Sequence, residues 1–150
     1  MYLKKGDKAP NFSVLNQDNE IVTLSDVKHK KNLIWFFPKA NTPGWTIQGC
    51  GFRDEFKKFK NINIIGVSAD SPVKQKKFIE KYNFPYMMLA DESKKMIKAY
   101  KAWGLKKFMG REYEGVHRIS YLIDEHGKIE CVFDKVKTKT HARDVLDEIS

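Results

Sequence analysis

The sequence predicts an α/β fold in which a mixed central sheet carries helices on both of its faces. Two runs, 32–37 and 62–68, are apolar on both strand faces, which is typical of strands covered by helices on either side. Each run is followed by helix-start residues, Thr42-Pro43-Gly44 after the first and Ser71-Pro72 after the second. Hairpin patterns stand near both ends of the chain. Parallel strand–helix units therefore combine with antiparallel strands in one sheet.

The first half of the chain supplies a hairpin, a central strand and a long helix. Runs 11–15 and 21–24 flank the turn residues 17–19 and predict an N-terminal β-hairpin. The strand 32–37 ends at Pro38. Thr42 is the candidate N-cap of the next helix, with Pro43 at its first position. We expect that helix to run to about Lys60, because aromatic residues recur at helical spacing, at Phe52, Phe56 and Phe59.

The second half alternates strands and helices before a closing hairpin. Strand 62–68 leads into a helix that begins after Ser71, and 86–89 is a short strand. Residues 91–93 open a helix that Gly104 closes, with an apolar face of Met96, Ile97, Tyr100 and Trp103. Two further strands, 118–124 and 128–133, flank a turn at 125–127 and predict an antiparallel hairpin. Thr140 caps a last helix that ends near Ile149.

Length and composition indicate one domain, residues 1–150, with a substantial core. The chain has 150 residues, of which 41% are hydrophobic and 13% aromatic, and this excludes a disordered protein. Its two cysteines are too few for a secreted disulfide scaffold and form no zinc-type pair, so we expect a cytoplasmic protein. The first residues resemble no signal peptide, and no run approaches the ~18 apolar residues of a membrane span. We therefore expect no membrane partner.

The basic charge is spread over the surface. There are 28 basic and 19 acidic side chains, a formal net charge of +9, and the excess is mostly scattered lysine pairs such as Lys57-Lys58 and Lys106-Lys107. Such pairs are typical of solvated helix faces, and no nucleic-acid motif accompanies them. We expect no specific nucleic-acid partner, although a basic surface binder whose affinity falls with salt remains an alternative. The four histidines form no metal-binding pattern, so neither a metal nor another cofactor is expected.

The loop after the first central strand carries the chemistry. Functional groups of open α/β sheets lie beyond the carboxyl ends of the strands, and residues 38–45 occupy that place. Pro38, Thr42 and Trp45 stand at the spacing of the peroxiredoxin signature PxxxTxxC, with tryptophan where the signature has cysteine. The run 42–54 resembles the peroxiredoxin Q, or bacterioferritin comigratory protein, type of this family. Matching segments extend over nearly the whole chain and include 6–12, 103–104, 108–110 and 115–124.

This resemblance implies a thioredoxin-like fold and an antioxidant thiol peroxidase. Typical members reduce hydrogen peroxide and organic hydroperoxides and are regenerated by thioredoxin or a similar dithiol reductant. By the same match Pro38 shields the catalytic loop, Thr42 orients the peroxide, Arg118 is the cationic partner, and Cys50 stands at the position of the resolving cysteine. A helix N-terminus and a nearby arginine both favour a thiolate, which is the nucleophile that peroxide reduction requires. We expect a monomer or weak dimer.

Trp45 removes that nucleophile. An indole N–H donates a hydrogen bond but cannot ionise in the useful range or form a sulfenic acid, so we expect this chain to be inactive or severely impaired. Cys50 is a poor substitute, because five residues along a helix correspond to about 7.5 Å of rise and about 140° of rotation. The alternative function is a non-catalytic binding protein that engages a redox partner through Cys50. Cys131 alternates with Ile129 and Phe133 on a strand and is expected to be a buried structural cysteine.

Overall fold

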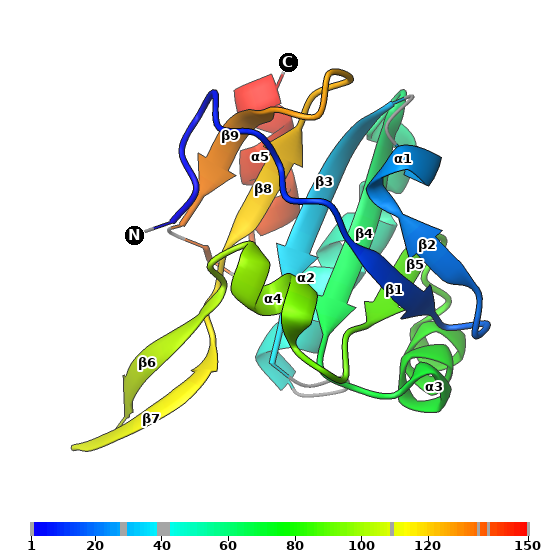
Figure 1. Ribbon diagram of the computed structural model, residues 1–150. Coiled ribbons are helices and arrows are strands. Elements are labelled where there is room, and N and C mark those ends of the chain that lie inside the picture. The colour runs from blue at the N-terminus through cyan, green and yellow to red at the C-terminus, as the bar shows by residue number, and fades with distance from the viewer. Residues whose placement is uncertain are drawn as a thin grey trace.

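A seven-stranded mixed sheet forms the centre of the molecule (Figure 1). The computed structural model describes residues 2–27, 30–38, 43–108, 110–134, 136–137 and 139–149; for residues 43–45, 107, 108 and 149 it describes the backbone only. The strands are β1 (Ser13–Asn16), β2 (Ile21–Thr23), β3 (Lys31–Phe36), β4 (Ile62–Ser68), β5 (Met87–Ala90), β6 (Trp103–Phe108), β7 (Arg111–Val116), β8 (Ser120–Ile123) and β9 (Ile129–Phe133). The helices are α1 (Leu24–Val27), α2 (Pro43–Asp54), α3 (Pro72–Tyr82), α4 (Lys95–Ala99) and α5 (His141–Ile149), with a 3₁₀ turn, η1, at Phe56–Lys58.

The sheet order is β2-β1-β5-β4-β3-β8-β9, with β3 and β4 at its centre. Strands β3, β4 and β5 are parallel, whereas β8 runs antiparallel to β3, and β9 to β8. Side chains of β3 alternate between two cores: Ile34 and Phe36 face one, Leu33 and Trp35 the other, and all four are fully buried. The prediction of a mixed sheet with a strand covered on both faces is confirmed.

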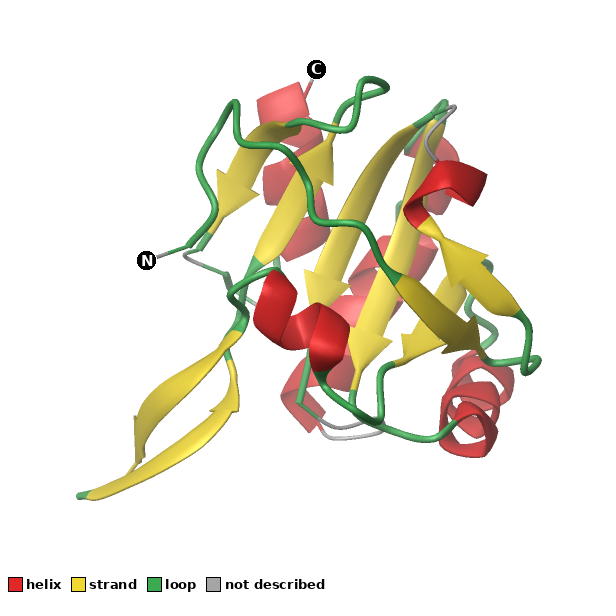
Figure 2. Ribbon diagram, viewed as in Figure 1, coloured by secondary structure: helices red, strands yellow, loops and turns green. Residues whose placement is uncertain are grey.

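The helices divide between the two faces of the sheet. Phe52 of α2, Phe78 of α3 and Val145 of α5 pack in the core that contains Trp35. Leu24 of α1 and Ile97 of α4 pack in the opposite core. Figure 2 shows the same division, with α4 in front of the sheet and α2 and α5 behind it. The loop between β3 and α2 starts at the carboxyl end of β3, a central strand of the sheet.

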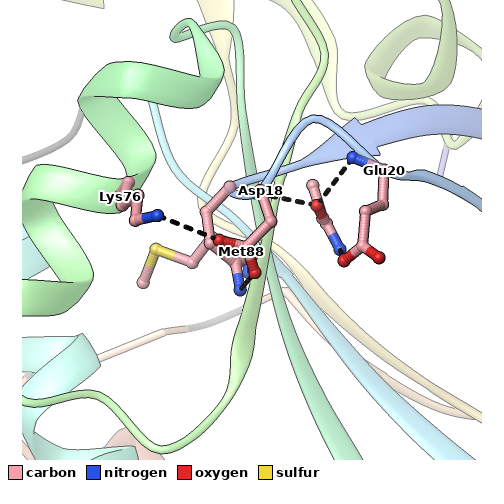
Figure 3. Close-up of polar contacts among 6 residues, drawn as sticks. Asp18, Glu20, Lys76 and Met88 are labelled. Atoms are coloured by element: carbon pink, nitrogen blue, oxygen red, sulfur yellow. Dashed lines mark hydrogen bonds and ion pairs between the residues drawn. The ribbon is translucent and has the colours of Figure 1, made fainter.

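The predicted N-terminal hairpin is present; it adds β1 and β2 to one edge of the sheet, and its turn is fixed to neighbouring elements (Figure 3). Within the turn, the Asn16 side-chain oxygen accepts hydrogen bonds from the backbone N–H groups of Asp18 and Glu20, at 2.8 and 3.1 Å. Lys76 of α3 forms an ion pair with Asp18, with 3.3 Å between nitrogen and oxygen. These contacts explain why a short hairpin holds one register at the sheet edge.

Helix α2 is shorter than the sequence predicted. It ends at Asp54 rather than near Lys60, and the 3₁₀ turn η1 follows it. The tighter turn places the Phe56 ring on Tyr86, at 6.5 Å between centroids, while Phe59 packs against Phe52 at 5.9 Å. The recurring phenylalanines that indicated one long helix therefore serve two successive elements.

The helix predicted from residue 91 to Gly104 is wrong in its extent, because α4 covers Lys95–Ala99 alone. The Asp91 carboxylate accepts the backbone N–H of Ile97 at 2.8 Å and so caps this short helix from a distance. Lys101 adopts a positive φ of 58° that ends the helical path. Trp103 and Gly104 instead begin β6, which pairs with β7 in a separate two-stranded sheet, called the ribbon below (residues 103–116). The ribbon projects from the body of the molecule (Figure 1).

Helix α1 was not predicted, because Leu24 was assigned to the strand before it; the other elements agree with their predictions within a few residues. Ser71 caps α3 by accepting the Lys74 backbone N–H, and Pro72 occupies the first turn. Strands β8 and β9 form the predicted C-terminal hairpin, and α5 starts directly after Thr140. No helix within the described ranges has the length and apolar character needed to cross a bilayer.

Candidate active site

The site predicted from sequence begins where β3 ends. Phe37 is fully buried behind the strand, and Pro38 after it is half-buried. Thr42, the predicted N-cap and peroxide-orienting residue, lies outside the described residues. Helix α2 begins at Pro43, so the backbone of Trp45 lies in the first turn of that helix. Position 45 thus lies at the N-terminal, electropositive end of a helix, a location that favours a thiolate.

Arg118 is placed beside the same end of β3. The Phe36 backbone N–H donates to the Ile119 carbonyl at 3.1 Å, which extends the pairing of β3 with β8 toward the loop. Continuing the register of Trp35 with Ser120 by two positions sets Arg118 opposite Phe37. Its side chain is exposed and lies just before β8, which starts at Ser120 rather than at Arg118 as the sequence indicated. Arg118 and the first turn of α2 therefore both border the carboxyl end of β3.

The structure adds Lys106 and His117 to this neighbourhood. Lys106 donates from its ammonium group to the Val116 carbonyl at 2.9 Å, which holds its charge at the base of the ribbon. Burial and the neighbouring Arg118 guanidinium both lower the pKa of Lys106. His117 bonds through Nδ1 to the Tyr2 hydroxyl at 3.1 Å, and burial, followed by the charge of Lys106, lowers the pKa of His117. The lowered pKa favours the uncharged imidazole, so the positive charge next to His117 is carried by Lys106 and Arg118.

Cys50 lies in the middle of α2 and has a different environment. Position 45 and Cys50 are in one uninterrupted helix, which supports the predicted separation along and around the helix axis. Cys50 is partly buried against the core that contains Trp35. Burial raises the pKa of its thiol, and the Arg53 guanidinium offsets only part of that effect. A neutral thiol is a weak nucleophile, so the location of Cys50 disfavours the role that position 45 would have.

Aromatic rings hold this part of α2 in place. The Tyr86 hydroxyl donates to the Gly49 carbonyl at 2.8 Å, and burial raises the pKa of Tyr86 well above its ordinary value. Phe84 stacks on Tyr86 at 5.3 Å, and a Cβ atom at Gly49 would lie 3.0 Å from the Phe84 ring. Arg53 adds a hydrogen bond to the Tyr82 carbonyl at 2.8 Å. The absence of a side chain at position 49 is what lets the helix approach these rings.

The sequence prediction for Cys131 needs correction. Cys131 is only partly buried, since its strand β9 is at the edge of the sheet and lines an open cavity of about 670 Å³ with Tyr2 and Phe133. Burial raises the pKa of its thiol. His141 begins α5 and is buried, with its Nε2 2.9 Å from the Ser120 hydroxyl.

Within the part of the chain that the structure describes, no group of three or more potential ligands could hold a metal ion.

Lys106 was missed at the sequence level because it belonged to one of several lysine pairs assigned to solvated helix faces. A strand signal was present, because glycines at 104 and 115 flank alternating residues around the turn residue Gly110.

Comparisons with known proteins agree with this geometry. The AhpC/TSA family model matches residues 5–132. Peroxiredoxin Bcp of Escherichia coli K12 is 46% identical over 147 residues, which cover 97% of this chain and 94% of the relative. Peroxiredoxin Bcp of Bacillus subtilis 168 is 40% identical over 151 residues, 99% of this chain and 96% of the relative.

Solved structures give the same result. A cysteine-to-serine mutant of Xylella fastidiosa PrxQ superposes with a TM-score of 0.91 at 26% identity, covering 99% of this chain and 96% of that one. Bacterioferritin comigratory protein of Xanthomonas campestris, described for its alkyl peroxide reduction activity, has a TM-score of 0.86 at 27% identity over 92% of this chain and 89% of that one. The fold is therefore thioredoxin-like, and the chain belongs to the AhpC/TSA family as a peroxiredoxin of the Bcp, or Q, type.

Proposed function

We propose that this chain is a hydroperoxide-reducing scaffold of the peroxiredoxin Q type whose nucleophile position is occupied by Trp45, and that it turns over little or no peroxide as it stands. The observation that carries the proposal is the location of position 45 in the first turn of α2, directly after the loop that follows β3. Family membership supports the parent reaction, thiol-dependent reduction of hydroperoxides with a thioredoxin-type reductant.

The parent reaction needs a thiolate that attacks one peroxide oxygen. That oxygen becomes a sulfenic acid on the cysteine, and the other oxygen leaves as water or an alcohol after taking up a proton. The helix N-terminus and the Arg118 guanidinium would stabilise the thiolate and the developing negative charge. In this proposal Pro38 and Thr42 shape the loop around the peroxide. Trp45 leaves these supporting groups in place and removes the atom that reacts.

Cys50 fills the resolving position in the proposal and does not replace the nucleophile. Its thiol is partly buried and has a raised pKa, and Cys50 lies along α2 beyond the first turn of that helix. In a revertant with cysteine at position 45, helix α2 would have to unwind locally before the two sulfur atoms could bond, because a disulfide requires Cα atoms within about 7 Å.

The decisive measurement is hydrogen peroxide consumption in a thioredoxin-coupled assay with the chain and Trp45→Cys side by side. We expect Trp45→Cys to exceed the parent by at least about a hundredfold, since a positioned thiolate is the reacting group. Trp45→Ser is the matched control, because it also removes the bulky indole but supplies no thiol.

The possible outcomes separate the two functions that the sequence left open. Activity of the parent chain that disappears in Cys50→Ser would show that Cys50 is the nucleophile and would contradict the proposal. Inactivity of both the parent and Trp45→Cys would favour a binding protein that engages a redox partner through Cys50. A mixed disulfide, formed when the Cys50 thiolate attacks the disulfide of oxidised thioredoxin and releases one thioredoxin thiolate, would then be the species to seek.

A further inference from the structure

We propose that helix α5 is an acid-sensitive strap: it stays docked on the sheet and on α2 while the His141 imidazole is uncharged, and protonation of His141 releases it. The imidazole takes no part in the proposed peroxide chemistry, so the release of α5 does not depend on turnover.

Helix α5 covers the side of the sheet that contains Trp35, and it also packs against α2. Val145 is fully buried in that core, and Ala142 is buried as well. At Gly51 of α2, a Cβ atom would lie 3.6 Å from the Cβ of Ala142, an ordinary packing distance. The strands beneath α5 pair with one another, β9 with β8 and β8 with β3. The sheet therefore keeps its backbone pairing when α5 leaves.

His141, at the start of α5, contacts three other elements at one buried point. Its Nε2 lies 2.9 Å from the Ser120 hydroxyl of β8, and only 2% of the residue is exposed. Its ring meets Phe52 of α2 edge to face, with 5.5 Å between centroids, and meets Phe133 of β9 in the same way at 5.9 Å. None of these three partner side chains carries a charge that could balance an imidazolium. A proton on His141 would therefore place a positive charge among a hydroxyl and two phenyl rings.

Two features of α5 itself act on a charge at His141, and they oppose each other. His141 is the first residue of the helix, whose electropositive N-terminal end disfavours a cation. Asp144, one turn later, favours the cation, and its carboxylate also accepts a hydrogen bond from the Thr140 hydroxyl at 3.0 Å. Within the described residues, Asp144 is the charged group that acts on the imidazole. Burial outweighs it and lowers the pKa of His141 to about 4, so the docked helix disfavours the proton.

Release of α5 returns His141 to water, where an imidazole has its ordinary pKa of about 6.5. Between this value and about pH 4, the released form binds a proton that the docked form does not, so acid favours release. From these two pKa values, the released fraction grows about twentyfold between pH 7 and pH 5. Above about pH 6.5 neither form is protonated, and docking has its full strength.

The test is amide hydrogen exchange of the full chain at pH 7 and pH 5, with protection factors that correct for the intrinsic pH dependence of exchange. We expect the protection of the Val145 and Leu146 amides to fall about twentyfold from pH 7 to pH 5. At pH 5 it should be at least about tenfold below that of Ile34 in β3, because the strap opens without the sheet. His141→Gln keeps an uncharged hydrogen-bonding side chain and should reduce the pH dependence to less than about threefold. His126→Gln, the matched control at an exposed histidine, should keep the twentyfold fall.

Equal protection of α5 and β3 at pH 5 would mean that α5 leaves only in global unfolding, and would overturn the proposal. Protection of α5 that does not change with pH in the parent, or that changes as much in His141→Gln, would also overturn it. Should His141→Gln fail to fold, Ser120→Ala decides. The imidazole still titrates there but has lost its hydrogen-bond partner, so α5 should exchange about fivefold faster at both pH values and keep its pH dependence. Unchanged exchange in Ser120→Ala would reject the strap.

Discussion

The middle of helix α2 and the β6–β7 ribbon differ in how much of their apolar surface is buried. Around α2, Trp35 and Phe52 are fully buried, and the rings of Phe84 and Tyr86 enclose the helix backbone at Gly49. On the ribbon, by contrast, Leu105 and Tyr113 are exposed, and an isolated pair of strands has little apolar burial to stabilise it. Burial raises the pKa of the Cys50 thiol, whereas Arg118, at the base of the ribbon, is exposed. The reactivity of a side chain in this molecule depends on which region holds it.

The largest expected effect tests the difference in burial. Phe52→Ala should destabilise the protein by about 3–5 kcal/mol, because it leaves a cavity among Trp35, Phe59 and His141. Leu105→Ala on the ribbon should change the free energy of unfolding by less than about 0.5 kcal/mol. Urea denaturation of both variants measures the contrast. Equal losses would mean that the ribbon contributes to the core.

The next prediction concerns the pH dependence of stability that arises from the buried His141, which packs against Phe52. Burial lowers the pKa of His141 to about 4, against about 6.5 in the unfolded chain. Between these values the unfolded state binds the extra proton, so this contribution to stability is complete above about pH 6.5 and is lost as pH falls toward 4. The loss is about 3 kcal/mol. Denaturation between pH 4 and 7 should show the slope in the parent and in His126→Gln, which alters an exposed histidine, and a smaller slope in His141→Gln.

A pair of glycines in α2 tests how closely the aromatic rings enclose the helix. A Cβ atom at Gly49 would meet Phe84 at 3.0 Å and Trp35 at 3.3 Å, so Gly49→Ala should lower stability by about 1–3 kcal/mol. At Gly51 the nearest atom is the Cβ of Ala142 at 3.6 Å, an ordinary contact. Gly51→Ala should therefore raise stability by up to about 1 kcal/mol, through helix propensity. Thermal melts of the two variants must move in opposite directions if this account is correct.

The smallest expected effect concerns the thiol of Cys50. Burial raises the pKa of the Cys50 thiol, so its alkylation by iodoacetamide in a Cys131→Ser background should be slower than that of a free thiol. The midpoint of the plot of alkylation rate against pH should lie at higher pH. Arg53→Gln should slow it further, since the guanidinium favours the thiolate. Rapid alkylation at neutral pH would place Cys50 in an activating environment and would revive it as a candidate nucleophile.

Local sequence signals predicted several elements because their causes are local. Ser71 followed by Pro72 specifies the start of α3, and the apolar runs of β3 and β4 can only be buried between two layers of helices. The helix boundaries after residue 54 and around residue 100 were missed. Phe56 and Trp103 have helical spacing, but distant partners decide their places: Tyr86 stacks on Phe56, and β7 pairs with Trp103.

In the candidate site, too, some features follow from the sequence and others are seen only in the tertiary structure. The sequence by itself determined the family, the location of position 45 after a central strand, and the loss of the nucleophile, because those follow from residue identity and spacing in one continuous segment. Only the tertiary structure decided that Lys106 accompanies Arg118 and that aromatic rings from the loop before β5 lie against Gly49, next to Cys50. Those contacts join segments far apart in the chain, and their energies depend on burial and on distance in space. Residue order alone cannot specify such quantities.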